Sequence, residues 1–208
     1  MSLTATLARL RRLVALDLAV LDDVRHDSSA TVWALVVATA SMAMLGGGGW
    51  LWWVFSGFGN ADSVLFKTVL LGTLAGVLLW LVWLLVVYAL VQRLTGVITP
   101  VEQLVRAAGF ATFPLMLGIF MAVPAISFGV GLVALGGWLL VTQEAVERAT
   151  GAPVGVAILA NLAGFAAWVL LMALLTTASN QLGPGPLLAE SLWESISGYE
   201  GGRALLGN

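Results

Sequence analysis

The longest uncharged stretch near the middle of the chain, residues 107–143, reads AAGFATFPLMLGIFMAVPAISFGVGLVALGGWLLVTQ. A continuous helix of these residues would be about 55 Å long, whereas the hydrocarbon core of a bilayer is about 30 Å thick. Pro124 lies near the middle, and proline cannot continue the hydrogen bonding of a helix. The stretch therefore predicts two short spans, 107–123 and 125–143, joined by a tight hairpin at Pro124 and with a kink at Pro114 in the first.

Three further uncharged runs occupy residues 28–61, 68–92 and 149–189. Their apolar parts are each long enough for one crossing and predict spans over 30–55, 68–91 and 154–178. The chain of 208 residues is 60% apolar and 10% charged, whereas soluble domains are about a quarter charged. We therefore expect an all-α fold, a polytopic membrane helix bundle with five transmembrane helices, in a domain covering residues 29–178.

Basic residues are divided unequally between the two sides of this arrangement. Seven of the nine fall on the side of the N-terminus, and the other two are Lys67 and Arg203. Because Arg and Lys in short loops favour the cytoplasm, we expect a cytoplasmic N-terminus and an extracytoplasmic C-terminus. Eight arginines against one lysine, with much Ala and Gly, are typical of a GC-rich prokaryotic gene, so a prokaryotic cell membrane is the expected location.

Residues 1–28 precede the first span and are expected to form a cytoplasmic amphipathic helix. Its apolar residues recur every three or four positions, at Leu3, Leu7, Leu10, Val14, Leu18, Leu21 and Val24. Docking of this helix on the bundle is the expected arrangement, and contact with the lipid surface or with a partner protein is the alternative. The aspartates in the same segment argue for weak lipid anchoring at most.

The C-terminal segment, residues 179–208, is the predicted extracytoplasmic tail. Leu188, Leu192, Ile196 and Tyr199 recur at helical spacing. This spacing predicts a short interfacial helix.

The composition excludes several kinds of chemistry. The chain has no cysteine and one histidine, which removes thiolate metal sites, haem attachment and the usual catalytic triads. A net charge of −2 argues against a nucleic-acid partner, which would require a basic face. We therefore expect no cofactor and no enzymatic activity.

One polar cluster lies just before the first span and contains Asp22, Asp23, His26 and Asp27. Residues four apart share a helix face, so the cluster could bind a divalent cation. The simpler interpretation is a solvated acidic segment that caps the first span. We favour the simpler one because the cluster has no partner at membrane depth.

Inside the predicted spans, Tyr88 is the only ionisable side chain. Coupled transporters place carboxylates, histidines or lysines at this depth, so a coupled transporter is disfavoured. Asn161 is expected to hydrogen-bond between helices. Small residues four apart allow close helix contact and are found at Gly72 with Gly76 and at Ala160 with Gly164.

Three segments resemble the Yip-one family, the Ypt/Rab-interacting membrane proteins, in their prokaryotic form. They are LDLAVLDDVRHDSSATVWA (16–34), EQLVRAAGFATFP (102–114) and WLLVTQEAVERATG (138–151), together with the hairpin at Val123-Pro124. The resemblance covers most of residues 16–178 and implies five spans with a cytoplasmic N-terminus. Eukaryotic members bind small GTPases. This sequence has no long N-terminal domain ahead of its first span, so a GTPase partner is expected only by analogy.

These observations predict a non-enzymatic membrane scaffold or adaptor that organises membrane lipids or partner proteins. The partner could be a second copy, forming a homodimer, or another membrane protein. The alternative is a passive carrier or channel for a small or apolar solute, with a cavity beside the break at Pro114.

Overall fold

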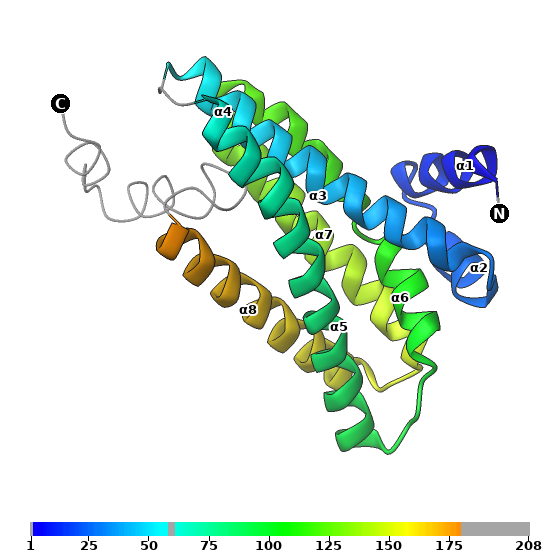
Figure 1. Cartoon of the computed structure of the whole chain (residues 1–208). Coiled ribbons are helices and arrows are strands. Elements are labelled where there is room, and N and C mark those ends of the chain that lie inside the picture. Colours follow the sequence, from blue (N-terminus) through cyan, green and yellow to red (C-terminus); the bar gives the residue numbers. More distant parts are fainter. Residues whose placement is uncertain (1, 58–60, 180–208) are drawn as a thin grey trace.

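The computed structural model describes residues 2–57 and 61–179, and the regular elements within them are all helices. Five helical segments are long and apolar enough to cross a membrane: Ala30–Phe55, Ala61–Thr95, Val101–Ala122, Pro124–Thr150 and Val154–Leu175. They pack into an elongated bundle (Figure 1). The all-α class and the five membrane helices are therefore confirmed. The predicted interfacial helix of the tail lies outside the described residues.

Several spans combine helices of different type. The elements are α3 (Ala30–Phe55); α4 (Ala61–Val64), the π-helix η1 (Leu65–Leu71) and α5 (Gly72–Thr95); α6 (Val101–Phe110) and the 3-10 helix η2 (Phe113–Ala122); the 3-10 turn η3 (Pro124–Ile126) and α7 (Ser127–Thr150); and α8 (Val154–Ser179). The second, third and fourth spans extend beyond the predicted 68–91, 107–123 and 125–143. Uncharged runs mark the hydrocarbon core, whereas a helix continues into the polar region on either side.

A hairpin turn lies at Pro124, where the sequence predicts it. η2 ends at Ala122, Val123 is extended (φ −90°, ψ 107°), and Pro124 begins η3. At Pro114, where the sequence predicts a kink, the structure has a change of helix type: α6 ends at Phe110 and η2 begins at Phe113, with Pro114 in its first turn. A 3-10 helix rises about 2.0 Å per residue, so the ten residues of η2 span about 20 Å, roughly 5 Å more than in an α-helix.

The amphipathic segment before the first span folds as two helices rather than one. These are α1 (Leu3–Val14) and α2 (Val20–His26). The continuous helix expected over 3–24 is broken at Leu16, whose φ of 61° is left-handed and costs about 1 kcal/mol for a leucine. Complete burial of Leu13 on one side and Leu21 on the other offsets this cost.

Glycine lets α3 approach its neighbours at backbone distance. A methyl group on Gly48 would overlap the carbonyl oxygen of Gly118 in η2, and one on Gly46 would lie 2.7 Å from the carbonyl oxygen of Thr68 in η1. In a bilayer the hydrophobic effect does not drive helices together, so their association depends on close packing of this kind. The glycine string of residues 46–49 therefore serves as a packing surface within α3.

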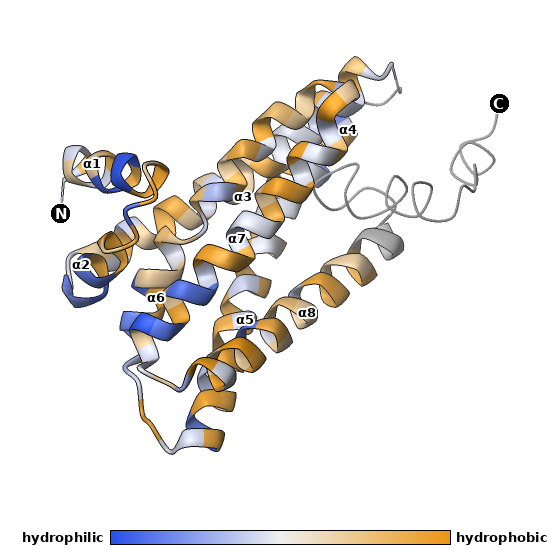
Figure 2. Cartoon of the chain, turned by 180° about the vertical axis from the view of Figure 1, so that it is seen from behind, coloured by the Kyte–Doolittle hydropathy of each residue, from blue (hydrophilic) through white to orange (hydrophobic). Residues whose placement is uncertain are grey.

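Polar residues gather at one end of the bundle. Figure 2 shows them on α1, α2 and the adjoining parts of α6 and α7, while the long helices are mostly apolar. Large apolar side chains remain exposed along the spans, among them Val32 at 68% and Leu140 at 72%. An apolar exterior of this kind is suited to lipid.

Candidate functional site at the polar end of the bundle

The four polar residues singled out in the sequence lie at this polar end. Asp22, Asp23 and His26 belong to α2, and Asp27 follows as its C-terminal cap. α2 buries its apolar residues and packs against α6 and α7, which leaves its carboxylates free to meet neighbouring charges. The carboxylates point to different partners and do not converge on one point.

Asp22 connects α2 to the fourth span. Its carboxylate accepts a hydrogen bond from Nη1 of Arg148 on α7 and lies 3.1 Å from Nε of Arg25. Nη2 of Arg148 also lies 2.5 Å from Oε1 of Glu144, one turn earlier. Partly exposed ion pairs contribute about 1 kcal/mol or less, so this network orients α2 on α7 more than it stabilises the fold.

Asp23 faces α1 instead. Nη1 of Arg12 donates a hydrogen bond to Oδ2 of Asp23 at 2.8 Å, and Nε donates to Oδ2 of Asp17 at 2.7 Å. These hydrogen bonds, that to Asp17 most, raise the pKa of Arg12. Arg12 therefore stays charged and ties α1 to the turn after it and to α2.

Asp27 connects the start of the first span to α1. Its Oδ1 accepts hydrogen bonds from the hydroxyl of Ser29 at 2.6 Å and from the Ser29 backbone N–H at 3.0 Å. Its Oδ2 accepts one from Nη2 of Arg9 at 2.9 Å. The hydroxyl of Ser29 and then Arg9 lower the pKa of Asp27 below its ordinary value of 3.8, so Asp27 is ionised at neutral pH.

The arrangement gives little support to a cation site. Throughout residues 2–57 and 61–179, no three His, Asp or Glu side chains come together in a way that could hold a metal ion. Each aspartate of the segment is paired with arginine, and Nδ1 of His26 lies 2.9 Å from the backbone carbonyl oxygen of Asp22. The polar end is thus an ion-paired joint between α1, α2 and the bundle.

Few polar side chains lie within the spans, and two of their hydrogen bonds connect one span with another. Nδ2 of Asn161 on α8 donates to the carbonyl oxygen of Leu139 on α7 at 3.2 Å. The hydroxyls of Thr112 and Ser41 lie 3.2 Å apart and join the middle of the third span, between α6 and η2, to α3. The geometry of these groups is that of structural contacts.

An aromatic cluster, mostly buried, fills the space between α5, α7 and α8, and no pattern in the sequence predicts it. Its rings belong to Trp83, Trp138, Phe165 and Trp168. The ring centroids of Trp83 and Trp138 are 4.7 Å apart, and those of Trp138 and Trp168 are 5.0 Å apart. Tryptophan usually lies at the membrane interface, so its presence deep in an uncharged run is the available signal for such a cluster.

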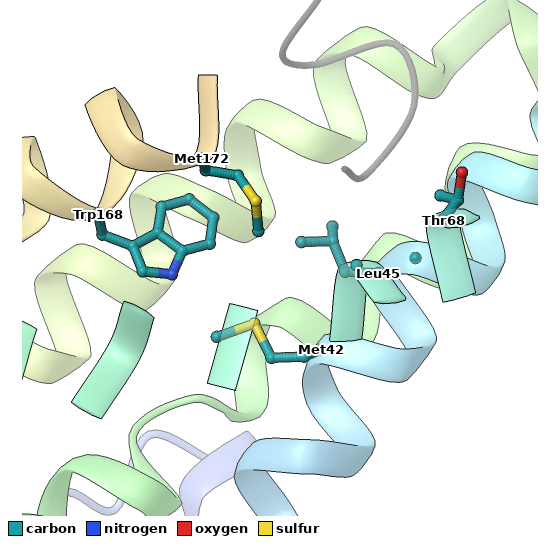
Figure 3. A pocket seen from close by; sticks show the side chains of 7 residues that line it. Met42, Leu45, Thr68, Trp168 and Met172 are labelled. Carbon is teal, nitrogen blue, oxygen red and sulfur yellow. The ribbon is translucent and has the colours of Figure 1, made fainter. Parts of the chain in front are cut away.

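A small hollow adjoins this cluster at Trp168. Figure 3 shows Trp168 and Met172 of α8 facing Met42 and Leu45 of α3, with Thr68 of η1 nearby. Its volume is about 10 Å³, room for roughly one water molecule. No substrate larger than water fits there.

A larger hollow lies at the hairpin end. Its volume is about 650 Å³, and its lining is apolar: Leu117, Phe120, Ala125, Ile126, Gly129, Val130 and Val133. The exposed side chains of Phe120 and Val133 border it, so it is an open groove on the outside of the bundle.

The comparisons with known proteins find no relative. No protein-family model, curated protein or solved structure matches the chain. Function is therefore inferred from the arrangement of the side chains.

The small residues proposed for helix packing are used inside the chain. Gly76 accepts a hydrogen bond at its carbonyl oxygen from Nε1 of Trp168, and Gly164 packs beneath the ring of Trp83. Ala160 is fully buried, and Gly72 lines the small hollow. These four residues serve the contact between α5, α8 and their neighbours, so they do not form an exposed dimer face.

Proposed function

We propose that this chain is a non-enzymatic integral membrane scaffold or adaptor, of the Yip type that its sequence resembles, which organises lipids or partner proteins. The observation that carries the proposal is the filled interior of the bundle. Where a carrier would need a path, between α3, α5, α7 and α8, the chain places four large aromatic rings and a hollow of about 10 Å³.

The polarity of the side chains in the interior supports the same proposal. Coupled transporters and pumps bind their ions or protons with ionisable groups at membrane depth. The buried polar side chains of the described spans are hydroxyls, indoles and the amide of Asn161, several of them in contacts between helices. Activity is therefore assigned to the surfaces of the bundle.

The proposed membrane is a prokaryotic cell membrane, with the polar end in the cytoplasm. Basic residues support this orientation, because arginines gather at the polar end and the positive-inside rule favours the cytoplasm for that end. These arginines are Arg9, Arg11, Arg12, Arg25, Arg93, Arg106 and Arg148. A partner protein, including a small GTPase by analogy with the family, would meet the ion-paired joint there. A second copy would meet the chain through its lipid-facing side chains.

The groove at the hairpin end supports a second candidate, a passive carrier for a small or apolar solute. Its volume of about 650 Å³ is in the range of small-molecule sites, and its lining is apolar. The groove opens outward beside η2 and α7, whereas a carrier also needs a route to the other face.

Solute permeability of vesicles distinguishes the two functions. The purified chain is reconstituted into lipid vesicles, and the entry of glycerol and urea is followed by light scattering after rapid mixing. Apolar solutes cross a bilayer unaided, so they are not used. A scaffold predicts rates equal to those of protein-free vesicles, and faster entry would contradict it.

A pair of variants shows whether any such entry passes through the groove. A side chain at Gly129 or at Gly155 would meet no atom within 4 Å of its Cβ, so both positions accept a larger residue. Gly129→Trp fills the groove, and Gly155→Trp is the matched control on α8. Entry that is abolished by Gly129→Trp alone would establish the carrier.

A further inference from the structure

α1 leaves one apolar face uncovered in the described structure. Leu3, Leu7 and Val14 are 57%, 55% and 69% exposed and lie within about 40° of one another around the helix. Thr6 and Leu13, on another face, are buried. α1 thus docks through one face and presents a separate row of large apolar side chains.

The position of α1 places this row beside the membrane boundary. In Figure 1, α1 lies to the side of the bundle near the beginning of α3. Arg9 pairs with Asp27, three residues before α3 begins. Val32, in the first turn of α3, is already 68% exposed and suited to lipid. The helix α1 therefore lies next to the start of the first span, close to the level expected for the leaflet surface.

The ion pairs change the electrostatic argument about α1. From composition, the aspartates at 17, 22, 23 and 27 oppose contact with a lipid surface. In the folded chain each of them is paired with arginine. Arg11 is exposed, and no acidic side chain of the described residues lies within ion-pair distance of it. α1 therefore presents an apolar row with a free guanidinium group at its edge.

We propose that α1 is an interfacial helix whose row Leu3, Leu7 and Val14 enters the boundary between headgroups and acyl chains of the leaflet at the polar end. Arg11 contacts lipid phosphate beside it. Binding comes mainly from burial of the three apolar side chains, and one free arginine adds a modest preference for anionic lipid. α1 would then be the site at which the proposed scaffold organises lipids. The assignment of this leaflet to the cytoplasmic side rests on the proposed function.

We assign lipid as the partner of the apolar row, because a helix attached to a membrane-inserted bundle is always close to lipid. A short amphipathic helix held against a membrane bundle is already at the leaflet, whereas a protein partner would have to be recruited. The row is narrow and has a basic edge, which is the composition of interfacial helices.

Neighbouring labels on α1 test the proposal in the full-length protein. The chain contains no cysteine, so Leu7→Cys and Ala8→Cys each accept a single environment-sensitive fluorophore. Ala8 is also exposed but points about 100° away from Leu7. The labelled proteins are reconstituted into vesicles of phosphatidylcholine and phosphatidylglycerol, with and without brominated acyl chains.

We expect the label at position 7 to emit at shorter wavelength, to be quenched by the brominated chains and to be quenched by aqueous iodide several-fold less than the label at position 8. Equal iodide quenching of the two labels, without quenching by bromine, would overturn the proposal. Protection of position 7 from iodide without bromine quenching would also overturn it and would indicate a protein partner or a second copy. These readings are independent of solute entry, so the scaffold proposal can fail or hold separately.

Discussion

Single residues decide how closely the helices of this bundle approach. Gly164 of α8 lies directly under the indole of Trp83 from α5, and a methyl group there would overlap the ring. Trp83 is fully buried and its ring packs against Trp138, so it has little room to move. The sequence marks Gly164 as a small residue in a span but does not show which side chain occupies the space above it.

Gly164→Ala should therefore destabilise the protein by about 1–3 kcal/mol, the usual cost of overpacking a filled core. Gly155→Ala is the matched control on α8, because its Cβ would meet no atom within 4 Å. Thermal unfolding of both variants in one detergent checks the prediction. A melting temperature for Gly164→Ala equal to that of Gly155→Ala would contradict the packing between α5 and α8.

Residue patterns do not show which residues far apart in the sequence contact one another. The spacing of Asp22, Asp23, His26 and Asp27 predicts residues that share a helix face, yet it does not reveal that Asp22 pairs with Arg148, 126 residues away. That pairing depends on how α2 and α7 pack in three dimensions. For the same reason, four aromatic residues from three spans are not recognisable as one cluster in the sequence.

At the scale of the elements, the prolines are the informative residues. Pro124 locates the turn between the third and fourth spans, and Pro114 locates the change from α6 to η2. After Pro114, Gly118 of η2 approaches Leu45 of α3 at backbone distance, a contact that no local pattern reports. The break at Leu16 is likewise hidden, because the apolar spacing continues through it.

The docking of α2 on α7 can be measured with a double-mutant cycle. Asp22→Ala, Arg148→Ala and the double variant should show a coupling of up to about 1 kcal/mol that decreases at high salt. Unfolding midpoints in one detergent supply the values.

The control cycle uses Asp23→Ala in place of Asp22→Ala, again combined with Arg148→Ala. Asp23 is adjacent to Asp22 on α2 but pairs with Arg12 on α1. Its coupling to Arg148 should be close to zero. Equal coupling in the two cycles would mean that α2 does not sit on α7 as described.

At the scale of the whole molecule, four uncharged runs and one central proline are sufficient to predict five membrane helices. They are not sufficient to show whether the bundle is closed. Closure comes from the aromatic cluster and from glycine contacts between helices distant in sequence. The proposed scaffold depends on that closure, since an aqueous path along the groove would make a carrier the better account.

Thiol accessibility in intact cells tests the closed five-span bundle most directly. Ala125 and Val133 both line the groove at the hairpin end, and Val133 lies about 12 Å further along the helix. In this cysteine-free chain, Ala125→Cys should react with an impermeant thiol reagent, whereas Val133→Cys should not, because lipid covers it. Comparable reaction at Val133→Cys would show water deep in the groove and contradict the closed scaffold, and absence of reaction at both positions would contradict an external hairpin.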